Sequence, residues 1–157
     1  MRGLAAALDA TPAALYHHIP GGLTELLGTI ATRVLDRCTE AAMQAAAMSA
    51  REDALGNALA AVYGVVAGKP ALARVAASPR CGTADVQEAW LRLIDVLADP
   101  AWQCVAPVPR GILSSVVMSL LLVGAGGREP RTEVARALIT TAIAGARQLA
   151  LRSKEAR

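Results

Sequence analysis

The sequence predicts an all-α protein. Hydrophobic residues make up 54% of the 157 positions, and many of them are alanine, which has the highest helix propensity. Apolar residues recur every three or four positions along most of the chain, whereas the alternation typical of half-buried strands is hard to find. Phenylalanine is absent, so alanine and aliphatic side chains must form the core. The length suits a small N-terminal domain joined to one larger helical domain.

The first predicted element is a short helix that ends in a tight turn. Leu4 and Leu8 lie one turn apart and face the same way, while the small Ala5 between them permits another helix to approach closely. Asp9-Ala10 is the predicted turn, because aspartate tolerates left-handed backbone better than most residues.

A second short helix follows directly. Thr11 is a suitable N-cap, and Pro12 falls at the first helical position, where its missing N–H costs nothing. Leu15 and Ile19 give this helix its buried side. Its outer face and flanks carry Ala13, Ala14, Tyr16, His17 and His18. Two short helices across a tight turn match the helix-turn-helix plan for entering a DNA major groove.

In this stretch the sequence resembles the DNA-reading part of the TetR family of bacterial repressors. The family pattern is matched at Met1-Arg2, Leu4-Ala5, Leu8, Thr11, Ala14-Leu15-Tyr16, His18-Ile19 and Glu25-Leu26-Leu27. The rest of the chain matches only in layout, because the helical ligand-binding and dimerisation domains of the family share little sequence. The resemblance implies that operator DNA is contacted by Thr11, Pro12, Ala13, Ala14, Tyr16, His17 and His18.

The chain departs from the family pattern in three places. Asp9 replaces the usual glycine of the turn, and Pro20-Gly21-Gly22 stands where a basic phosphate-contacting residue is common. The family also has a basic arm and a first helix before the position of Met1, which overlays an internal methionine of the pattern. We therefore expect an incomplete helix-turn-helix domain, a natural start upstream of Met1, and weak DNA binding by this exact chain.

The distribution of charge supports the same expectation. The net charge is +3, but residues 1–37 carry three basic and three acidic side chains, and residues 38–146 carry nine of each. The excess lies entirely in residues 147–157. Because phosphate neutralisation supplies most non-specific DNA affinity, the N-terminal segment has little to contribute to it.

A long helix is predicted over 23–47, with an inward stripe that includes Leu23, Ile30, Val34 and Cys38. It would connect the partial DNA-binding domain, residues 1–37, to the ligand-binding and dimerisation domain, residues 38–157. Arg33 and Arg37 on this helix are interpreted as a solvated face, with a phosphate contact as the alternative.

Three further helices are predicted before a loop. The first begins with a capping box, Ser49 with Glu52, and runs to about Ala67. A short helix opens at Pro70, and the next is capped by Thr83 and runs to about Ala98. Residues 99–109 contain three prolines and are predicted to be a loop.

The resemblance places a cavity for an apolar small-molecule effector among these helices and the next one. Bulky or polarisable side chains and an aliphatic wall are the candidates for contacting it. They are Leu59, Tyr63, Trp90, Leu93, Ile94 and Met118. The alternative is that these side chains simply fill the core.

The last two predicted helices, 110–124 and 132–152, are the candidates for dimerisation. The first is apolar nearly all round, so it must be covered on more than one side. A second copy of the chain could cover it by forming a four-helix bundle about a two-fold axis, as the resembling family does. The predicted contact residues are Ile112, Val116, Leu120, Leu121, Leu138, Ala142 and Leu149.

Catalytic and metal chemistry is not indicated. His17 and His18 are adjacent on a helix and diverge by about 100°, which disfavours joint chelation and leaves surface or DNA-facing histidines as the better interpretation. There is no phosphate-binding or nucleophile motif, so we expect neither an enzyme nor a metal or other cofactor. Three widely spaced cysteines fit reduced thiols in a cytoplasmic protein, and the uncharged run 111–127 is short for a membrane span.

The expected function is therefore that of a dimeric, cytoplasmic, TetR-like transcriptional regulator of the repressor type. A small apolar ligand would release it from double-stranded operator DNA. The alternative is a ligand-binding or interaction dimer that no longer binds DNA because its first helix is missing.

Overall fold

The computed structural model describes residues 2–78, 83–102, 108–126 and 131–155, and in these ranges it contains helices and no strand, which confirms the all-α fold. The elements are α1 (Arg2–Ala7), α2 (Pro12–His18), α3 (Gly22–Ala47), α4 (Ala54–Val66), α5 (Pro70–Ala76), α6 (Ala84–Leu97), the 3-10 turn η2 (Pro100–Trp102), α7 (Arg110–Ala125) and α8 (Thr132–Glu155).

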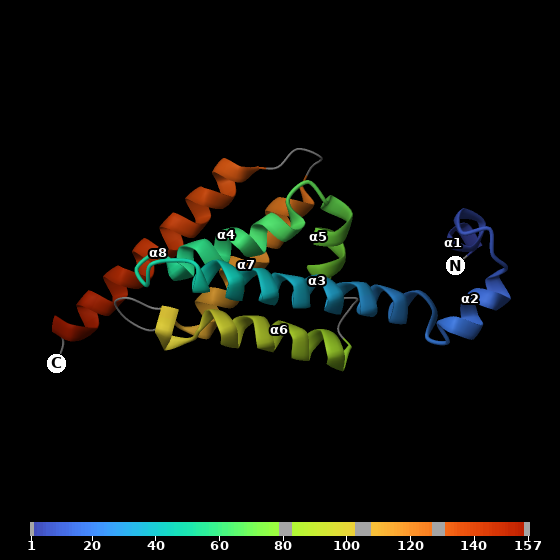
Figure 1. The fold of residues 1–157 in the computed structure, drawn as a ribbon, viewed down its shortest axis with the longest axis horizontal. Coiled ribbons are helices and arrows are strands. Elements are labelled where there is room, and N and C mark those ends of the chain that lie inside the picture. The colour runs from blue at the N-terminus through green and yellow to red at the C-terminus, as the bar shows by residue number, and fades with distance from the viewer. Residues whose placement is uncertain (1, 79–82, 103–107, 127–130, 156–157) are drawn as a thin grey trace.

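The long helix α3 runs through the molecule as its axis (Figure 1). In this view α4, α5 and α8 lie on one side of it, α6 lies on the other and α7 passes behind it, whereas α1 and α2 lie beyond its N-terminal end. Helix α3 packs most extensively against α4 and α6. The molecule therefore has a packed helical body, from α3 to α8, and a small helix-turn-helix segment, residues 2–18, that projects from it.

The core of the body is built from one face of each of its helices. Leu35 of α3, Leu59 of α4 and Leu93 of α6 are fully buried among other aliphatic residues. An ion pair supports the packing of α6 on α3: the guanidinium of Arg92 lies 2.9 Å from the carboxylate of Asp36. Because this pair is exposed, it adds little stability, and the buried leucines carry most of the packing energy.

One close approach of helices depends on a glycine. A Cβ atom on Gly124 of α7 would lie 2.9 Å from a methyl carbon of Val66 and 3.4 Å from the Cβ of Ala73. Helices α4 and α5 therefore approach α7 at a distance that only glycine permits.

The predicted helix starts at Pro70 and Thr83 are confirmed, but the capping box at Ser49 is wrong. Helix α4 begins at Ala54, after Asp53. The hydroxyl of Ser49 instead donates to the carbonyl oxygen of Ala45 at 2.6 Å and accepts from the amide of Asn57 at 2.7 Å. The Ser49 hydroxyl is thus bonded to the C-terminal end of α3 and does not cap the next helix.

The inward face of α3 agrees with the predicted stripe at Val34 and Cys38, but its large apolar side chains become buried later than predicted. Leu23, expected to be buried, is 52% exposed, because no element of the body reaches the first turn of the helix. After the buried Gly22, the buried face continues from Gly28 through Ala31, Val34, Leu35 and Cys38 to Ala42 and Ala46. Small residues thus form much of the contact surface of α3.

Within the described residues, no single helix is both long and apolar enough to cross a membrane. The pair α4 and α5 passes the same test only when taken together, and the two helices are bent by 114° at their junction.

Candidate functional site

The turn between α1 and α2 has the predicted geometry. Asp9 adopts a left-handed backbone with φ of 49°, and no other non-glycine residue in the described ranges has a positive φ. Thr11 is extended, and its hydroxyl accepts a hydrogen bond from the backbone N–H of Ala14 at 3.1 Å. Pro12 occupies the first helical position. The start of α2 is therefore fixed by three adjacent residues, each suited to its backbone position.

The outer face of α2 is open to solvent. Leu15 points inward and is buried, while the seven residues predicted to contact DNA are all exposed: Thr11, Pro12, Ala13, Ala14, Tyr16, His17 and His18. The rings of the two histidines are 5.3 Å apart and inclined by 73°. The described residues contain no cluster of His, Cys, Asp and Glu that could hold a metal ion.

A tight connection joins α2 to α3. The N–H of Ile19 donates to the carbonyl oxygen of Leu15 at 2.8 Å and closes α2. Gly22 has a φ of 64°, and the N–H of Gly21 donates to a carboxylate oxygen of Glu25 at 2.6 Å. The N–H of Gly22 in turn donates to the carbonyl oxygen of Ile19 at 2.9 Å, which links the end of α2 to the first residue of α3.

The helix-turn-helix segment leaves large apolar side chains uncovered. Leu8 is 60% exposed and Tyr16 is 50% exposed, next to the exposed Leu23 of α3. Ala5 and Leu15 are its buried apolar residues, and the side chain of Leu4 lies outside the described part. Ala5 and Leu15 alone thus form the core among the described side chains of the segment. Its shape is held mainly by the turn at Asp9, the Thr11 cap and the connection to α3.

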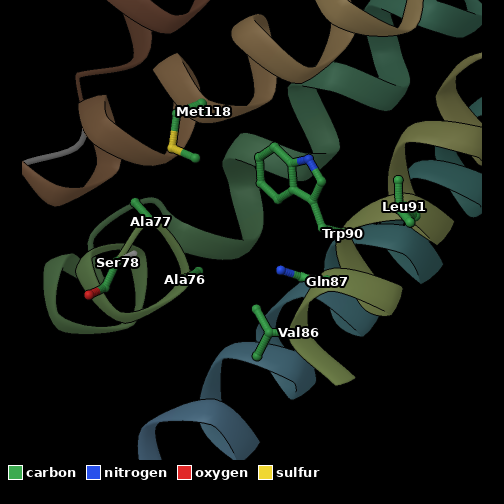
Figure 2. Close-up of a pocket in the computed structure, with 8 residues that line it drawn as sticks. All are labelled: Ala76, Ala77, Ser78, Val86, Gln87, Trp90, Leu91 and Met118. Carbon is green, nitrogen blue, oxygen red and sulfur yellow. The ribbon is translucent and has the colours of Figure 1, made fainter. Parts of the chain in front are cut away.

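A groove of about 420 Å³ lies on the body between the end of α5, α6 and α7 (Figure 2). It is lined by Ala76, Ala77, Ser78, Val86, Gln87, Trp90, Leu91 and Met118. The indole N–H of Trp90 donates to the hydroxyl of Ser114 on α7 at 3.2 Å. This bond orients the ring, which stands beside the opening with Met118 on the opposite wall.

Of the six residues predicted to contact a ligand, only Trp90 and Met118 line this groove. The other four, Leu59, Tyr63, Leu93 and Ile94, are buried in the body instead. They lie on the helix faces that pack against other helices, so their contacts are made with the protein. The hydroxyl of Tyr63 is buried without a hydrogen-bond partner in the described part of the chain.

Sequence patterns missed the polar and small residues of the groove. Gln87 was not singled out because an exposed glutamine on a helix is ordinary. Ala76 and Ala77 were missed because alanine is common along the whole chain. The change from α5 to a loop at Ser78 was the available signal, since an interrupted helix leaves a gap beside its neighbours.

A second groove, of about 560 Å³, runs between α7 and α8. Four predicted dimer contacts line it: Ile112, Val116, Leu138 and Ala142. The hydroxyls of Ser115 and Ser119 donate to backbone carbonyl oxygens one turn back in α7, at 2.9 and 2.8 Å. These two hydroxyls are already paired, so the groove is largely apolar, with the exposed Thr141 as a further polar lining residue.

Two other predicted dimer contacts are corrected by the structure. Leu120 and Leu121 are 0% exposed, because both side chains point into the body of their own subunit. They therefore cannot meet a partner chain while the subunit stays folded. The side chain of Leu149 lies outside the described residues.

Cys38 of α3 is buried, and its thiol lies 3.9 Å from the carbonyl oxygen of Val62. Burial raises the pKa of this thiol to about 12, because the thiolate would lose its hydration in the core. A thiol that stays protonated at neutral pH is a poor nucleophile. Cys81 and Cys104 lie outside the described residues.

Comparison with protein-family models, curated proteins and solved structures returned no match to this chain.

Proposed function

We propose that this protein is a homodimeric, DNA-binding transcriptional regulator of the repressor type, which an uncharged small molecule releases from its operator. The observation that carries the proposal is the geometry of α2. A left-handed turn at Asp9 and the Thr11 cap set off a short helix whose outer face is free, at the tip of the longest helix. A free outer face on the second helix is what major-groove recognition requires.

A homodimer is part of the proposal because a helix-turn-helix protein normally binds two half-sites related by a two-fold axis. The groove between α7 and α8 supports this. Its exposed stripe continues past Ser119 to Leu122 on α7, and past Leu138 to Val134 on α8. Apolar residues at these spacings share one face of each helix, and a second copy of the same face would cover them.

Selection from a random duplex DNA library tests the proposal directly. We expect the immobilised protein to enrich a palindromic consensus with half-sites about one helical turn, ~34 Å, apart. Ala13→Asp should abolish the enrichment, because it places a negative charge on the outer face of α2, near the phosphates. This change leaves folding intact, since an acidic residue is favourable in the first turn of a helix.

Ala60→Asp is the matched control. It makes the same charge change at an exposed position of α4, far along the chain from α2, and should leave the selected sequences unchanged. If no consensus emerges, or if the two variants lose binding equally, the proposed DNA-binding function is wrong.

A second candidate is a ligand-binding dimer without DNA-binding activity. Two observations favour it: residues 1–37 have no net charge, and Leu8 and Leu23 are exposed. A segment with little phosphate-neutralising charge and a thin core would bind DNA weakly. The failure of the DNA selection, combined with retained dimerisation and ligand binding, would identify this second function.

A further inference from the structure

We infer that the groove between α5, α6 and α7 binds an uncharged, flat aromatic molecule that carries one hydrogen-bonding group at its edge. The inference rests on the proposed function for the biological role of the groove, and it adds the chemical class of the ligand.

The absence of charge among the described lining residues is the first observation. The walls are formed by alanine, valine, leucine, methionine and tryptophan side chains, and the polar lining residues are Ser78 and Gln87. An ion beside these described walls would find no partner of opposite charge among them. The described part of the lining therefore favours an uncharged ligand over a carboxylate or an ammonium group.

The shape of the aromatic wall is the second observation. The Trp90 ring is oriented by its hydrogen bond to Ser114, which uses the indole N–H and leaves the ring itself as the contact surface. In Figure 2 the thioether of Met118 lies across from the ring of Trp90, and the small side chains of Ala76 and Ala77 complete the lining. An aromatic ring placed there would meet the indole on one side and a polarisable sulfur on the other.

The amide of Gln87 is the third observation. The side-chain amide points toward the space beside Trp90 in Figure 2, and it forms no hydrogen bond with the described residues. An amide has both donors and an acceptor, so it can pair with a carboxamide or a similar neutral group. Its position at the edge of the groove places the polar group of the ligand at the rim and the rings inside.

Three related probes test this assignment on the full chain in the absence of DNA. They are 2-naphthamide, which has a flat two-ring system and a neutral amide, the anion 2-naphthoate, and the saturated decahydronaphthalene-2-carboxamide. Binding is followed by calorimetry and by the fluorescence of Trp90 in a Trp102→Phe background. We expect 2-naphthamide to bind and to quench Trp90, and each of the other two to bind at least about tenfold more weakly.

Gln87→Leu should weaken 2-naphthamide binding by about tenfold, since one hydrogen bond is lost, and should leave the binding of 2-methylnaphthalene unchanged. Gln44→Leu makes the same chemical change on the exposed surface of α3, outside the groove, and should have no effect. Both positions are exposed, so both variants are expected to fold.

The inference is overturned if 2-naphthamide fails to bind, if the anion or the saturated analogue binds equally well, or if Gln87→Leu has no effect. Its outcome is separate from that of the DNA selection. Binding of 2-naphthamide without any selected DNA sequence defeats the proposed function and supports the assignment of the groove. Selection of an operator without 2-naphthamide binding supports the proposed function and overturns the assignment of the groove.

Discussion

The hydroxyl of Thr11 determines where α2 begins, and its removal has a local consequence. In Thr11→Ala, the N–H of Ala14 loses its acceptor, and we expect a cost of about 0.5–2 kcal/mol to the stability of α2. Faster hydrogen exchange at the Ala14 amide would report the effect. Thr11→Ser keeps the acceptor oxygen and should exchange nearly as slowly as the wild type. Equal exchange in all three proteins would show that the cap does not stabilise the helix.

Cys38 gives the protein a specific response to alkaline pH. Its thiol ionises near pH 9 in an unfolded chain, but burial raises the pKa to about 12 in the folded protein. Between these values the unfolded chain releases a proton that the folded chain retains, so the free energy of unfolding falls as pH rises, by about 1.4 kcal/mol per pH unit. Below pH 9 this contribution to stability is fully present.

Urea denaturation at pH 8 and pH 10 measures this difference. The comparison uses Cys81→Ala/Cys104→Ala as the parent and the same protein with Cys38→Ala as the variant. We expect the parent to lose more stability over this interval. An identical loss in both proteins would mean that the Cys38 thiolate is accommodated in the folded state.

The residues whose roles could be predicted are those whose interactions involve only neighbours in the sequence. Thr11, Pro12 and Thr83 act where the sequence places them, because an N-cap or a helix-starting proline depends on its immediate neighbours. Ser49 did not act as predicted, because Asn57, eight residues away, and the last turn of α3 compete for its hydroxyl. That competition depends on how the helices meet, which local sequence does not reveal.

At the level of elements, Gly124 and Gly64 should respond oppositely to the same substitution. Gly124→Ala puts a methyl group 2.9 Å from Val66, and we expect a loss of about 1–3 kcal/mol through overpacking. Gly64→Ala places a methyl group in α4 with no neighbouring atom within 4 Å, and should stabilise the protein by about 0.5–1 kcal/mol. Thermal unfolding of both variants shows whether each substitution raises or lowers the stability. A shift of the same sign in both would contradict the close packing of α7 against α4.

The helices themselves were easier to predict than the faces they bury. The start of α7 at Arg110 and the end of α3 at Ala47 agree with the expected bounds, and the start of α7 is marked by Pro109. The burial of Ala31 and Ala42 on α3 was harder to predict, because alanine is abundant on every face of the helix. Periodicity placed Trp90 on an inward stripe, and the family resemblance added Met118 as a candidate. The periodic pattern could not separate Trp90 from Leu93, which lies in the closed core.

At the scale of the whole molecule, the α7–α8 surface leads to a prediction about assembly. We expect the chain to sediment as a dimer at micromolar concentration and Ser115→Arg to sediment as a monomer. Ser115 is exposed in the subunit and lines the groove, so arginine there leaves the fold intact and places an uncompensated charge in the interface. Met43→Arg adds the same charge on an exposed position of α3 and should remain dimeric. A dimeric Ser115→Arg protein would exclude this surface as the interface.

The length of α3 has a mechanical consequence for the segment at its tip. A helix of 26 residues spans about 39 Å, and the end of α2 is linked to its first residue through the hydrogen bond between Ile19 and Gly22. If α3 pivots as a rigid rod about its far end, a rotation of about 5° swings that tip by about 3.4 Å. This displacement equals the rise of one step along a DNA strand, about 3.4 Å. On the proposed function, a tilt of this size is therefore enough to move α2 out of register with a base pair.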